Sequence, residues 1–275
     1  MNMKNITIIL SALFLLISCQ KESRIETSEK TVVTYEVQAP VEFEIKSTGS
    51  GQGSSVNALW YGVYHKKENG YAYMSDMSAH VAVTDASQKI SVPITLFKDQ
   101  EYKIIFVAQH IETTVSASGD ESNCYTYTVN EQGLMSLNPK ARITNGEQLD
   151  AFVYWEETGV IKNDYKKDIE LSRPLAQINI STSATETPEK ITVEVSGTAE
   201  SYDIFAKKYA TQTAVLTFAD LDCNGTDLAT VYVLPASNSV NLKLTMKYAG
   251  GTEVTKEVQS VSLAPNFKTN VTGNI

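Results

Sequence analysis

The residues of this chain that could catalyse a reaction or hold a metal ion are few and scattered. The three histidines, His65, His80 and His110, lack the spacing of a zinc-binding HExxH motif. No Gly-x-Ser-x-Gly turn, phosphate-binding glycine loop or Cys-x-x-Cys pair occurs. Carboxylates are spread along the chain, so the sequence reveals no glycosidase pair. We therefore expect no enzyme activity, no metal site and no cofactor.

One segment places oxygen ligands at the spacing of half a calcium loop. Asp220, Asp222 and Asn224 occupy relative positions one, three and five, and Gly225 follows them. The bidentate acid expected at position twelve is missing, because Val231 stands there. Asp, Asn and Gly are also the usual residues of turns between strands. We prefer a plain β-turn and keep calcium as the alternative.

A third kind of chemistry is the attachment of lipid to a cysteine. Residues 1–18 have the layout of a secretory signal, with Lys4 near the start and an apolar run too short to span a bilayer. The segment Leu16-Ile17-Ser18-Cys19 resembles the lipobox of bacterial lipoproteins. That resemblance implies cleavage between Ser18 and Cys19 and acylation of Cys19, for example with palmitate. The alternative is an ordinary signal peptide with a chance cysteine.

A polar linker, residues 19–30, separates this cysteine from the first expected strand. Two or more acyl chains on Cys19 would anchor the protein stably on a membrane. The segment Gln20-Lys21-Glu22-Ser23 is similar to the tag that sends some lipoproteins of Gram-negative anaerobes to the outer face. The expected location is the outer membrane, with the protein lipid-anchored and exposed at the cell surface.

Charge and the remaining cysteines limit the partners. The formal net charge is -9, and basic residues form only isolated doublets, so nucleic acid and bare anionic membrane are not expected partners. Cys124 and Cys223 could form a disulfide in an exported protein. They lie far apart in the sequence, and we prefer two separate, buried small side chains.

Alternating apolar and polar residues predict many short strands. The clearest stretches are residues 33–45, which Pro40 divides, and residues 240–248. Residues 102–108 are almost continuously apolar, as in a central strand buried on both faces. Asn69-Gly70 predicts a hairpin turn. No long helical period occurs after residue 18, so we expect an all-β fold, a sandwich or barrel.

The strand pattern restarts after a charged stretch at residues 163–168. This restart predicts two β-sandwich domains in tandem, residues 31–170 and residues 171–275. Aromatic residues gather in the first of them, including Trp60, Tyr64 and Trp155. Rings in strands are usually core residues. If these rings were exposed, they would form a sugar-binding platform.

Five segments of the chain resemble the fimbrillin family, the lipid-exported subunits and anchors of type V pili. They occur in the family's order and span nearly the whole chain after the lipobox. They are Leu59-Trp-Tyr-Gly-Val-Tyr64, Tyr102-Lys-Ile-Ile-Phe-Val-Ala-Gln109, Asp150-Ala-Phe-Val153, Leu171-Ser-Arg-Pro-Leu-Ala-Gln-Ile-Asn179 and Asn266-Phe-Lys-Thr-Asn-Val-Thr-Gly-Asn274. The resemblance implies tandem transthyretin-like sandwiches with Greek-key topology. It also implies assembly by strand exchange, in which a segment of one subunit completes a neighbour's sheet.

Two segments have the shape for this exchange, the first strand at residues 33–45 and the last strand. The last strand would present one face made of Phe267, Thr269, Val271 and Ile275. Both strands could instead pair within their own sandwiches. Family members that polymerise are cut after an arginine, which removes a first strand. Here Arg24 lies upstream of that strand, so a cut there would leave it in place.

The expected function is therefore that of a surface lipoprotein acting as a structural or adhesive component of a fimbria, as subunit, tip or anchor. The expected partners are the outer membrane, through the lipid, and other fimbrial subunits, through strand exchange. The alternative is a glycan-binding outer-membrane lipoprotein of a nutrient-uptake system. Exposed rings at Trp60, Tyr64 or Trp155 would favour that alternative. A surface hydrolase is the least favoured function, and a close pair of carboxylates in a deep cleft would be needed to support it.

Overall fold

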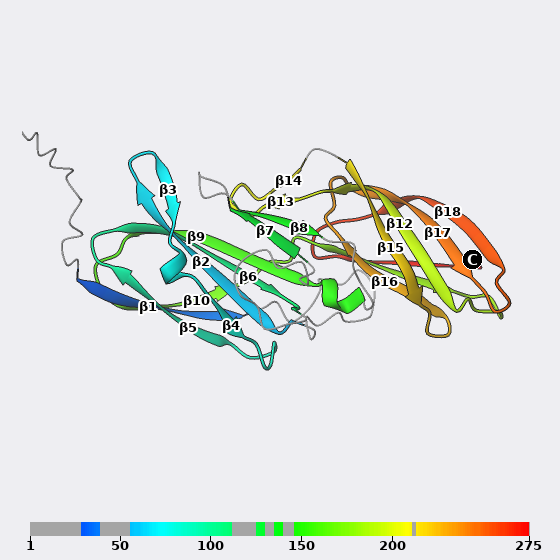
Figure 1. Ribbon diagram of the computed structural model, residues 1–275, viewed down its shortest axis with the longest axis horizontal. Helices are drawn as coiled ribbons and strands as arrows, with labels where there is room; N and C mark the ends of the chain where they lie inside the picture. The colour runs from blue at the N-terminus through cyan, green and yellow to red at the C-terminus, as the bar shows by residue number, and fades with distance from the viewer. Residues whose placement is uncertain are drawn as a thin grey trace, which may run out of the picture.

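The computed structural model describes residues 29–38, 56–111, 125–129, 135–139, 146–210 and 213–274. Figure 1 shows an elongated molecule, with the earlier strands gathered at one end and the later strands at the other. The helical pieces of the described chain are two short 3-10 turns, η1 (Ser75–Met77) and η2 (Gly146–Leu149). The predicted all-β fold class is confirmed.

The strands fall into two series along the chain. The first series is β1 (Lys30–Gln38), β2 (Ala58–Lys67), β3 (Gly70–Tyr73), β4 (Ala79–Ala82), β5 (Ile90–Phe97), β6 (Glu101–Gln109), β7 (Tyr125–Val129), β8 (Met135–Pro139), β9 (Ala151–Val160) and β10 (Tyr165–Glu170). The second is β11 (Ala176–Thr182), β12 (Lys190–Ala199), β13 (Tyr202–Asp203), β14 (Lys208–Tyr209), β15 (Thr213–Asp222), β16 (Asp227–Val233), β17 (Ser239–Lys247), β18 (Glu253–Ser262) and β19 (Lys268–Gly273).

The first series forms two facing sheets with a buried core between them. One sheet has the order β10-β1-β5, and the other has the order β3-β2-β6-β9, with β4 also paired to β2. Val33, Tyr35 and Val37 of β1 point into the core and are at most 1% exposed, as the alternation predicts. Burying a large apolar side chain contributes about 1.5–3 kcal/mol. Several such residues therefore hold β1 in place.

β6 is the central strand that its apolar run predicts. It lies between β2 and β9, antiparallel to both. Ile104 and Phe106 belong to the core between the two sheets, whereas Ile105 and Val107 belong to a second buried cluster on the opposite face. The hairpin predicted at Asn69-Gly70 joins β2 to β3, and Gly70 has φ 126°, a conformation that favours glycine.

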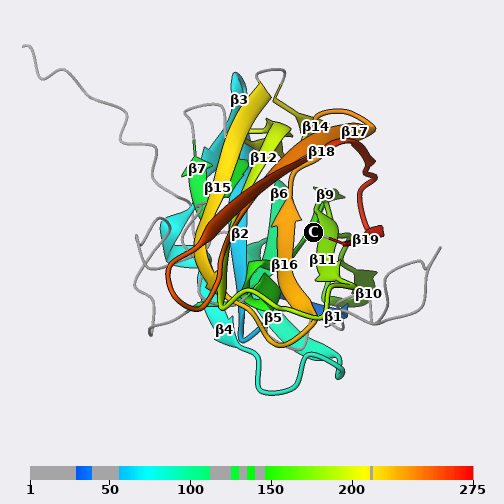
Figure 2. The same cartoon turned by 90° about the vertical axis from the view of Figure 1, so that its right-hand side faces the viewer.

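The second series also forms two sheets, in the orders β16-β11-β19 and β15-β12-β17-β18. In β17, the residues Val240, Leu242, Leu244 and Met246 are buried, which confirms the alternation. Figure 2, a view along the molecule, shows these strands in front of the earlier ones.

A further sheet joins the two series. Its order is β14-β13-β8-β7, so β13 from the second series pairs with β8 from the first. The second buried cluster likewise includes Trp60 and Tyr64 of β2 together with residues of β11, β12 and β17. The division into domains at residue 170 therefore stays a prediction, since a sheet and a buried cluster cross it.

The charged stretch at residues 163–168 is not simply a break between strands. Residues 165–170 form β10, which runs parallel to β1. Its lysines are paired: Lys166 Nζ lies 2.9 Å from Glu36 Oε1, and Lys167 binds Glu156. Ile169 points into the core and is 5% exposed. A strand at a sheet edge needs only such sparse apolar content, so alternation could not reveal it.

Candidate functional site

A buried polar cluster lies where the two strand series meet. Arg173, between β10 and β11, donates from Nε to Asp150 Oδ1 and from Nη2 to Asp150 Oδ2, both at 2.7 Å. Arg173 Nη1 also donates to Asn266 Oδ1 at 2.8 Å, and the guanidinium lies 4.4 Å from the centre of the Phe152 ring. Three of the five segments quoted from the sequence therefore converge here. Their convergence was not evident from the sequence, because the segments lie far apart along the chain and no local pattern records a contact between them.

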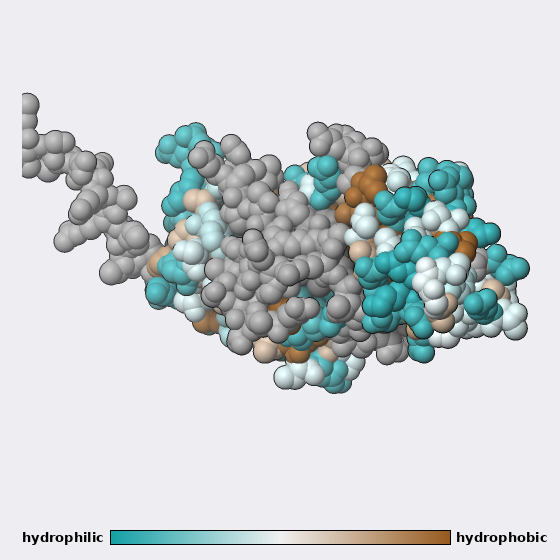
Figure 3. Space-filling model, turned by 45° about the vertical axis from the view of Figure 1, so that its right-hand side comes forward, coloured by the Kyte–Doolittle hydropathy of each residue, from teal (hydrophilic) through white to brown (hydrophobic). Residues whose placement is uncertain are grey.

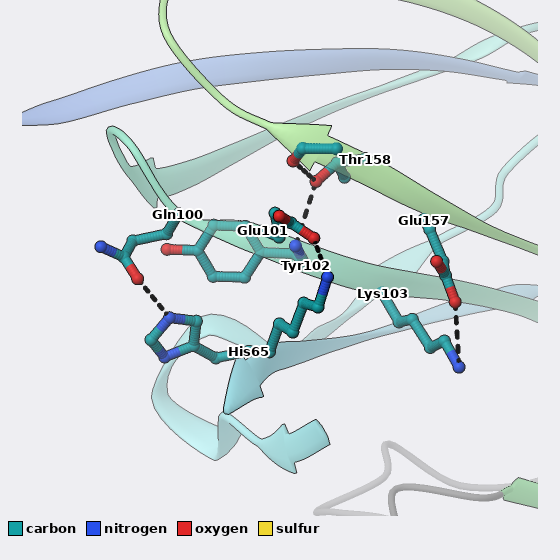
Figure 4. A network of polar contacts seen from close by, with 9 residues as sticks. His65, Gln100, Glu101, Tyr102, Lys103, Glu157 and Thr158 are labelled. Carbon is teal, nitrogen blue, oxygen red and sulfur yellow. Dashed lines mark hydrogen bonds and ion pairs between the residues drawn. The ribbon is translucent and has the colours of Figure 1, made fainter. Parts of the chain in front are cut away.

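A second contact between the series surrounds Lys103 of β6. Its Nζ lies 3.2 Å from Glu157 Oε1, which Figure 4 shows, and 4.2 Å from the centre of the Tyr71 ring. It also lies 4.8 Å from the centre of the Phe205 ring, in the turn between β13 and β14. Phe205 in turn packs edge-on against Tyr64 and Trp155. The β13–β14 turn thus seats an aromatic side chain on the sheet of the first series.

Tyrosines and one carboxylate fasten β1 to β9 and β10. Tyr35 donates to Glu156 Oε1 at 2.8 Å, and Tyr154 donates to Glu156 Oε2 at 3.0 Å. Lys167 binds the same carboxylate. Burial, with smaller contributions from Tyr165 and Glu156, raises the pKa of Tyr35 far above its ordinary value, so its hydroxyl remains a donor. This cluster connects β1, the middle strand of the β10-β1-β5 sheet, to β9 of the facing sheet.

His65 and His80 pack against neighbouring strands and are not grouped with other possible metal ligands. His65 shares a hydrogen bond of 2.7 Å with Gln100 Oε1 and stacks on Tyr102, as Figure 4 shows. Burial lowers the pKa of His80, whose Nε2 is buried without a hydrogen-bond partner. Within the described chain, no three His, Cys, Asp or Glu side chains are grouped so that they could hold a metal ion.

The rings that could have formed a sugar-binding platform are not at the surface. Trp60 is 2% exposed and Tyr64 is fully buried. Trp155 is partly buried and packs against the second buried cluster, to which Trp60 and Tyr64 belong. Ring exposure, the observation that would favour the nutrient-uptake alternative at these residues, is therefore not found.

The segment with calcium-like spacing is a hairpin between β15 and β16. Asn224 and Asp227 bond to each other through their backbones at 2.9 and 3.1 Å, which closes the turn. Asp220 Oδ1 lies 2.7 Å from Lys247 Nζ, and Asp222 Oδ1 lies 3.2 Å from Lys190 Nζ. These carboxylates face lysines rather than one another, as in the preferred β-turn interpretation.

Several predicted site residues lie outside the described chain. These are Ser18, Cys19, Arg24, Cys124 and Ile275. Cys223 is described, and burial, together with Asp222, raises the pKa of its thiol to about 11. The lipid attachment, the cleavage sites and a bridge between Cys124 and Cys223 stay predictions.

The strand-exchange segments are both paired within their own chain. β1 is hydrogen-bonded on both sides, by β10 and β5. β19 pairs on one side with β11, in parallel, and stands at the end of its sheet among the described strands. Thr269 and Val271 are half-buried there, and Phe267, just before the strand, accepts a hydrogen bond from Gln177 N–H through its carbonyl. Exchange by Phe267, Thr269, Val271 and Ile275 stays a prediction.

The described surface is largely polar. Figure 3 shows hydrophilic residues over most of the coloured part of one face, with small hydrophobic patches among them. The exposed large aliphatic residues are Val32, Val160 and Val215, the last at 60% exposure. Among the described segments, the short helical turns are the only helices, and neither has the length and apolar content to cross a membrane.

Solved structures with a similar fold come from Bacteroides and Porphyromonas species. A candidate cell adhesion protein of Bacteroides ovatus superposes with a TM-score of 0.50 and 11% identity, over 89% of this chain and 92% of that chain. A candidate cell adhesion protein of Bacteroides fragilis superposes with a TM-score of 0.50 and 13% identity, over 89% of this chain and 92% of that chain. The fimbrial anchor protein Mfa2 of Porphyromonas gingivalis overlays less well, with a TM-score of 0.45 and 14% identity, over 83% of this chain and 82% of that chain. The all-β fold expected from the fimbrillin resemblance is thus shared with solved structures of candidate cell adhesion proteins.

Comparison by sequence gives the family. No curated protein matches the chain. The model of a protein family described as "Family of unknown function (DUF6562)" matches residues 26–275. That range covers nearly the whole chain after the proposed signal peptide. The chain belongs to this family of unknown function, DUF6562.

Proposed function

We propose that the protein is a surface-exposed outer-membrane lipoprotein that serves as a structural or adhesive component of a fimbria, as subunit, tip or anchor. The observation that carries the proposal is the Leu16–Cys19 segment, which resembles a lipobox, in front of an all-β fold similar to that of candidate cell adhesion proteins. The resemblance of five ordered segments to fimbrillins supports the same role.

The geometry suits a part that bears load rather than one that turns over a substrate. The ion pair between Arg173 and Asp150, both fully buried, ties the two strand series together. The pairing of β13 with β8 adds a second tie. These two connections restrict relative motion of the two strand series.

Two variants test the anchoring and surface location. Cys19→Ala should abolish acylation, measured by labelling cells with a fatty-acid analogue, and should release the protein from the outer membrane. Cys223→Ala is the matched control and should keep the label. Digestion of intact cells with protease should remove the wild-type protein. Label on the Cys19→Ala variant, or full protection of the wild type from protease, would contradict the proposal.

Electron microscopy tests the fimbrial role itself. Negatively stained cells should show fewer, shorter or detached fibres when the gene is deleted, and the Cys19→Ala protein should not restore them. Fibres of unchanged number and length without the protein would argue against a fimbrial component.

A further inference from the structure

A hollow opens on the first strand series, away from the junction. It measures about 280 Å³ and lies where β4 and η1 come beside the edge of β5. Its lining includes Lys30, Tyr61, Asp76 and Phe97. The fimbrial role described above makes no use of it.

The polar groups of the hollow are available to a ligand. Lys30 and Asp76 are exposed, and neither forms an ion pair with another described residue. Tyr61 is half-buried, and burial raises the pKa of its hydroxyl, which therefore remains a hydrogen-bond donor. Together these groups provide an ammonium donor, a carboxylate acceptor and a phenol.

The remaining wall is apolar and partly aromatic. The ring of Phe97 lies 5.5 Å from Lys30 Nζ, and Pro93 and Met77 also line the hollow. A proline and a methionine beside an ammonium, a carboxylate and a phenol suit a ligand with one apolar face and a rim of hydroxyls.

An extended peptide suits the hollow less well, because the edge of β5 is blunted. Pro93 has no N–H, and Phe97 N–H donates to Tyr102 Oη at 3.0 Å. The Phe97 carbonyl accepts from the same hydroxyl at 3.4 Å. An added strand would find these groups absent or already bonded, so addition of a β-strand here is disfavoured.

We propose that this hollow binds one pyranose ring of an uncharged glycan. Asp76 would accept hydrogen bonds from sugar hydroxyls, Lys30 and Tyr61 would donate to others, and Pro93 and Met77 would contact the apolar face of the sugar ring. The volume is slightly below the 300 to 1,000 Å³ usual for drug-sized ligands, which fits a single sugar ring. A protein with net charge -9 disfavours acidic glycans, and the one lysine and one aspartate that line the hollow add no net charge.

The role of this hollow in adhesion rests on the proposed function. Glycan binding by the purified protein can be measured separately, without fibres. The full mature chain, purified in detergent, is applied to an array that carries neutral glycans and glycans ending in sialic or uronic acid. Binding to at least one neutral glycan is expected. The affinity for it is then titrated by calorimetry for the wild type and for variants.

Asp76→Ala should lower the affinity at least about tenfold, because a hydrogen bond to a charged group contributes about 1.5–3 kcal/mol. Tyr61→Phe keeps the ring and removes the donor, and should weaken binding about threefold or more. Glu186→Ala, an exposed acid in the second strand series, is the control and should bind like the wild type. Circular dichroism verifies that each variant is folded.

Binding to acidic glycans alone, binding to no glycan, or unchanged affinity of Asp76→Ala would each overturn the inference. Fibres that need the protein, found together with failure to bind sugar, would overturn this inference and leave the fimbrial proposal intact. If the protein binds sugar but fibres form normally without it, the fimbrial proposal would be overturned and this inference would stand.

Discussion

Arg173 and Asp150 form a bidentate ion pair, and both side chains are fully buried. Asp150 precedes β9 of the first strand series, and Arg173 precedes β11 of the second. The planar guanidinium matches both carboxylate oxygens and still has Nη1 to donate to Asn266. The pair fixes the approach of the two series at their junction.

Removing one partner of this pair should destabilise the protein strongly. Asp150→Ala leaves the Arg173 charge buried without its carboxylate, which costs about 3–5 kcal/mol. The expected result is a lower urea midpoint of unfolding with an unchanged slope. Asp168→Ala breaks an exposed pair with Lys89 and is the control, with an expected urea midpoint close to that of the wild type. Equal effects of the two variants would show that burial of the pair does not matter.

Truncation of Phe205 should loosen the second series from the first. Phe205 is 8% exposed and contacts Tyr64, Trp155 and Lys103 across the junction. Phe205→Ala should lower the free energy of unfolding by up to about 3–5 kcal/mol. The loss is smaller if the turn between β13 and β14 detaches, because no cavity then remains in the core. Hydrogen exchange should become faster in β13 and β14 while β17 keeps its protection. Uniform loss of protection in all strands would instead indicate a global effect without local release.

Gly62 should not tolerate a side chain, because the Trp60 ring occupies the space. A Cβ added at Gly62 would lie 2.1 Å from a ring carbon of Trp60, closer than real contacts allow. Gly62→Ala should therefore displace a buried tryptophan, at a cost of about 1–3 kcal/mol, and alter its fluorescence. Gly273→Ala is the control, since a Cβ there meets nothing within 4 Å. An unshifted emission maximum in Gly62→Ala would contradict this packing.

The strands that the sequence predicted are those in which one face is buried. Val33, Tyr35 and Val37 alternate with polar residues because β1 covers a core. Residues 102–108 lack alternation because β6 is covered on both faces. Both patterns follow from local burial, so a single sequence is sufficient to recognise them.

What the sequence could not predict depends on pairing between distant residues. β10 is charged because Lys166 and Lys167 find Glu36 and Glu156 on other strands. β13 is too short for any period and exists through its pairing with β8. The sequence favoured a core position for the rings of Trp60 and Tyr64, which the structure confirms, but it could not predict that Phe205, about 140 positions later, packs against Tyr64. Long-range contacts of this kind leave no local pattern.

The thiol of Cys223 should react slowly at mildly alkaline pH. Burial, with a contribution from Asp222, raises its pKa to about 11, so at pH 8 the reactive thiolate is about 100-fold rarer than at an ordinary pKa of about 9. The unfolded chain loses this proton at lower pH than the folded one, so the thiol contributes stability below about pH 9 that is lost as pH rises toward 11. Labelling with a thiol reagent in a Cys124→Ser background, with and without urea, measures the difference. Equal rates in both conditions would show an exposed thiol.

A reversible cross-link decides whether β19 takes part in strand exchange. Ser181 of β11 and Thr272 of β19 lie directly opposite, with their hydroxyl oxygens 2.7 Å apart on the outer face of the sheet. The double variant Ser181→Cys/Thr272→Cys, with Cys124 and Cys223 replaced by serine, should form a disulfide when oxidised. If β19 must leave β11 to complete a neighbour's sheet, oxidised protein should give no high-mass ladders on a gel, and a reductant should restore them. The single variant Ser181→Cys in the same background should assemble in both conditions. Ladders of equal length from the oxidised double variant would exclude β19 as the exchanged strand, because a covalently held strand cannot move to another subunit.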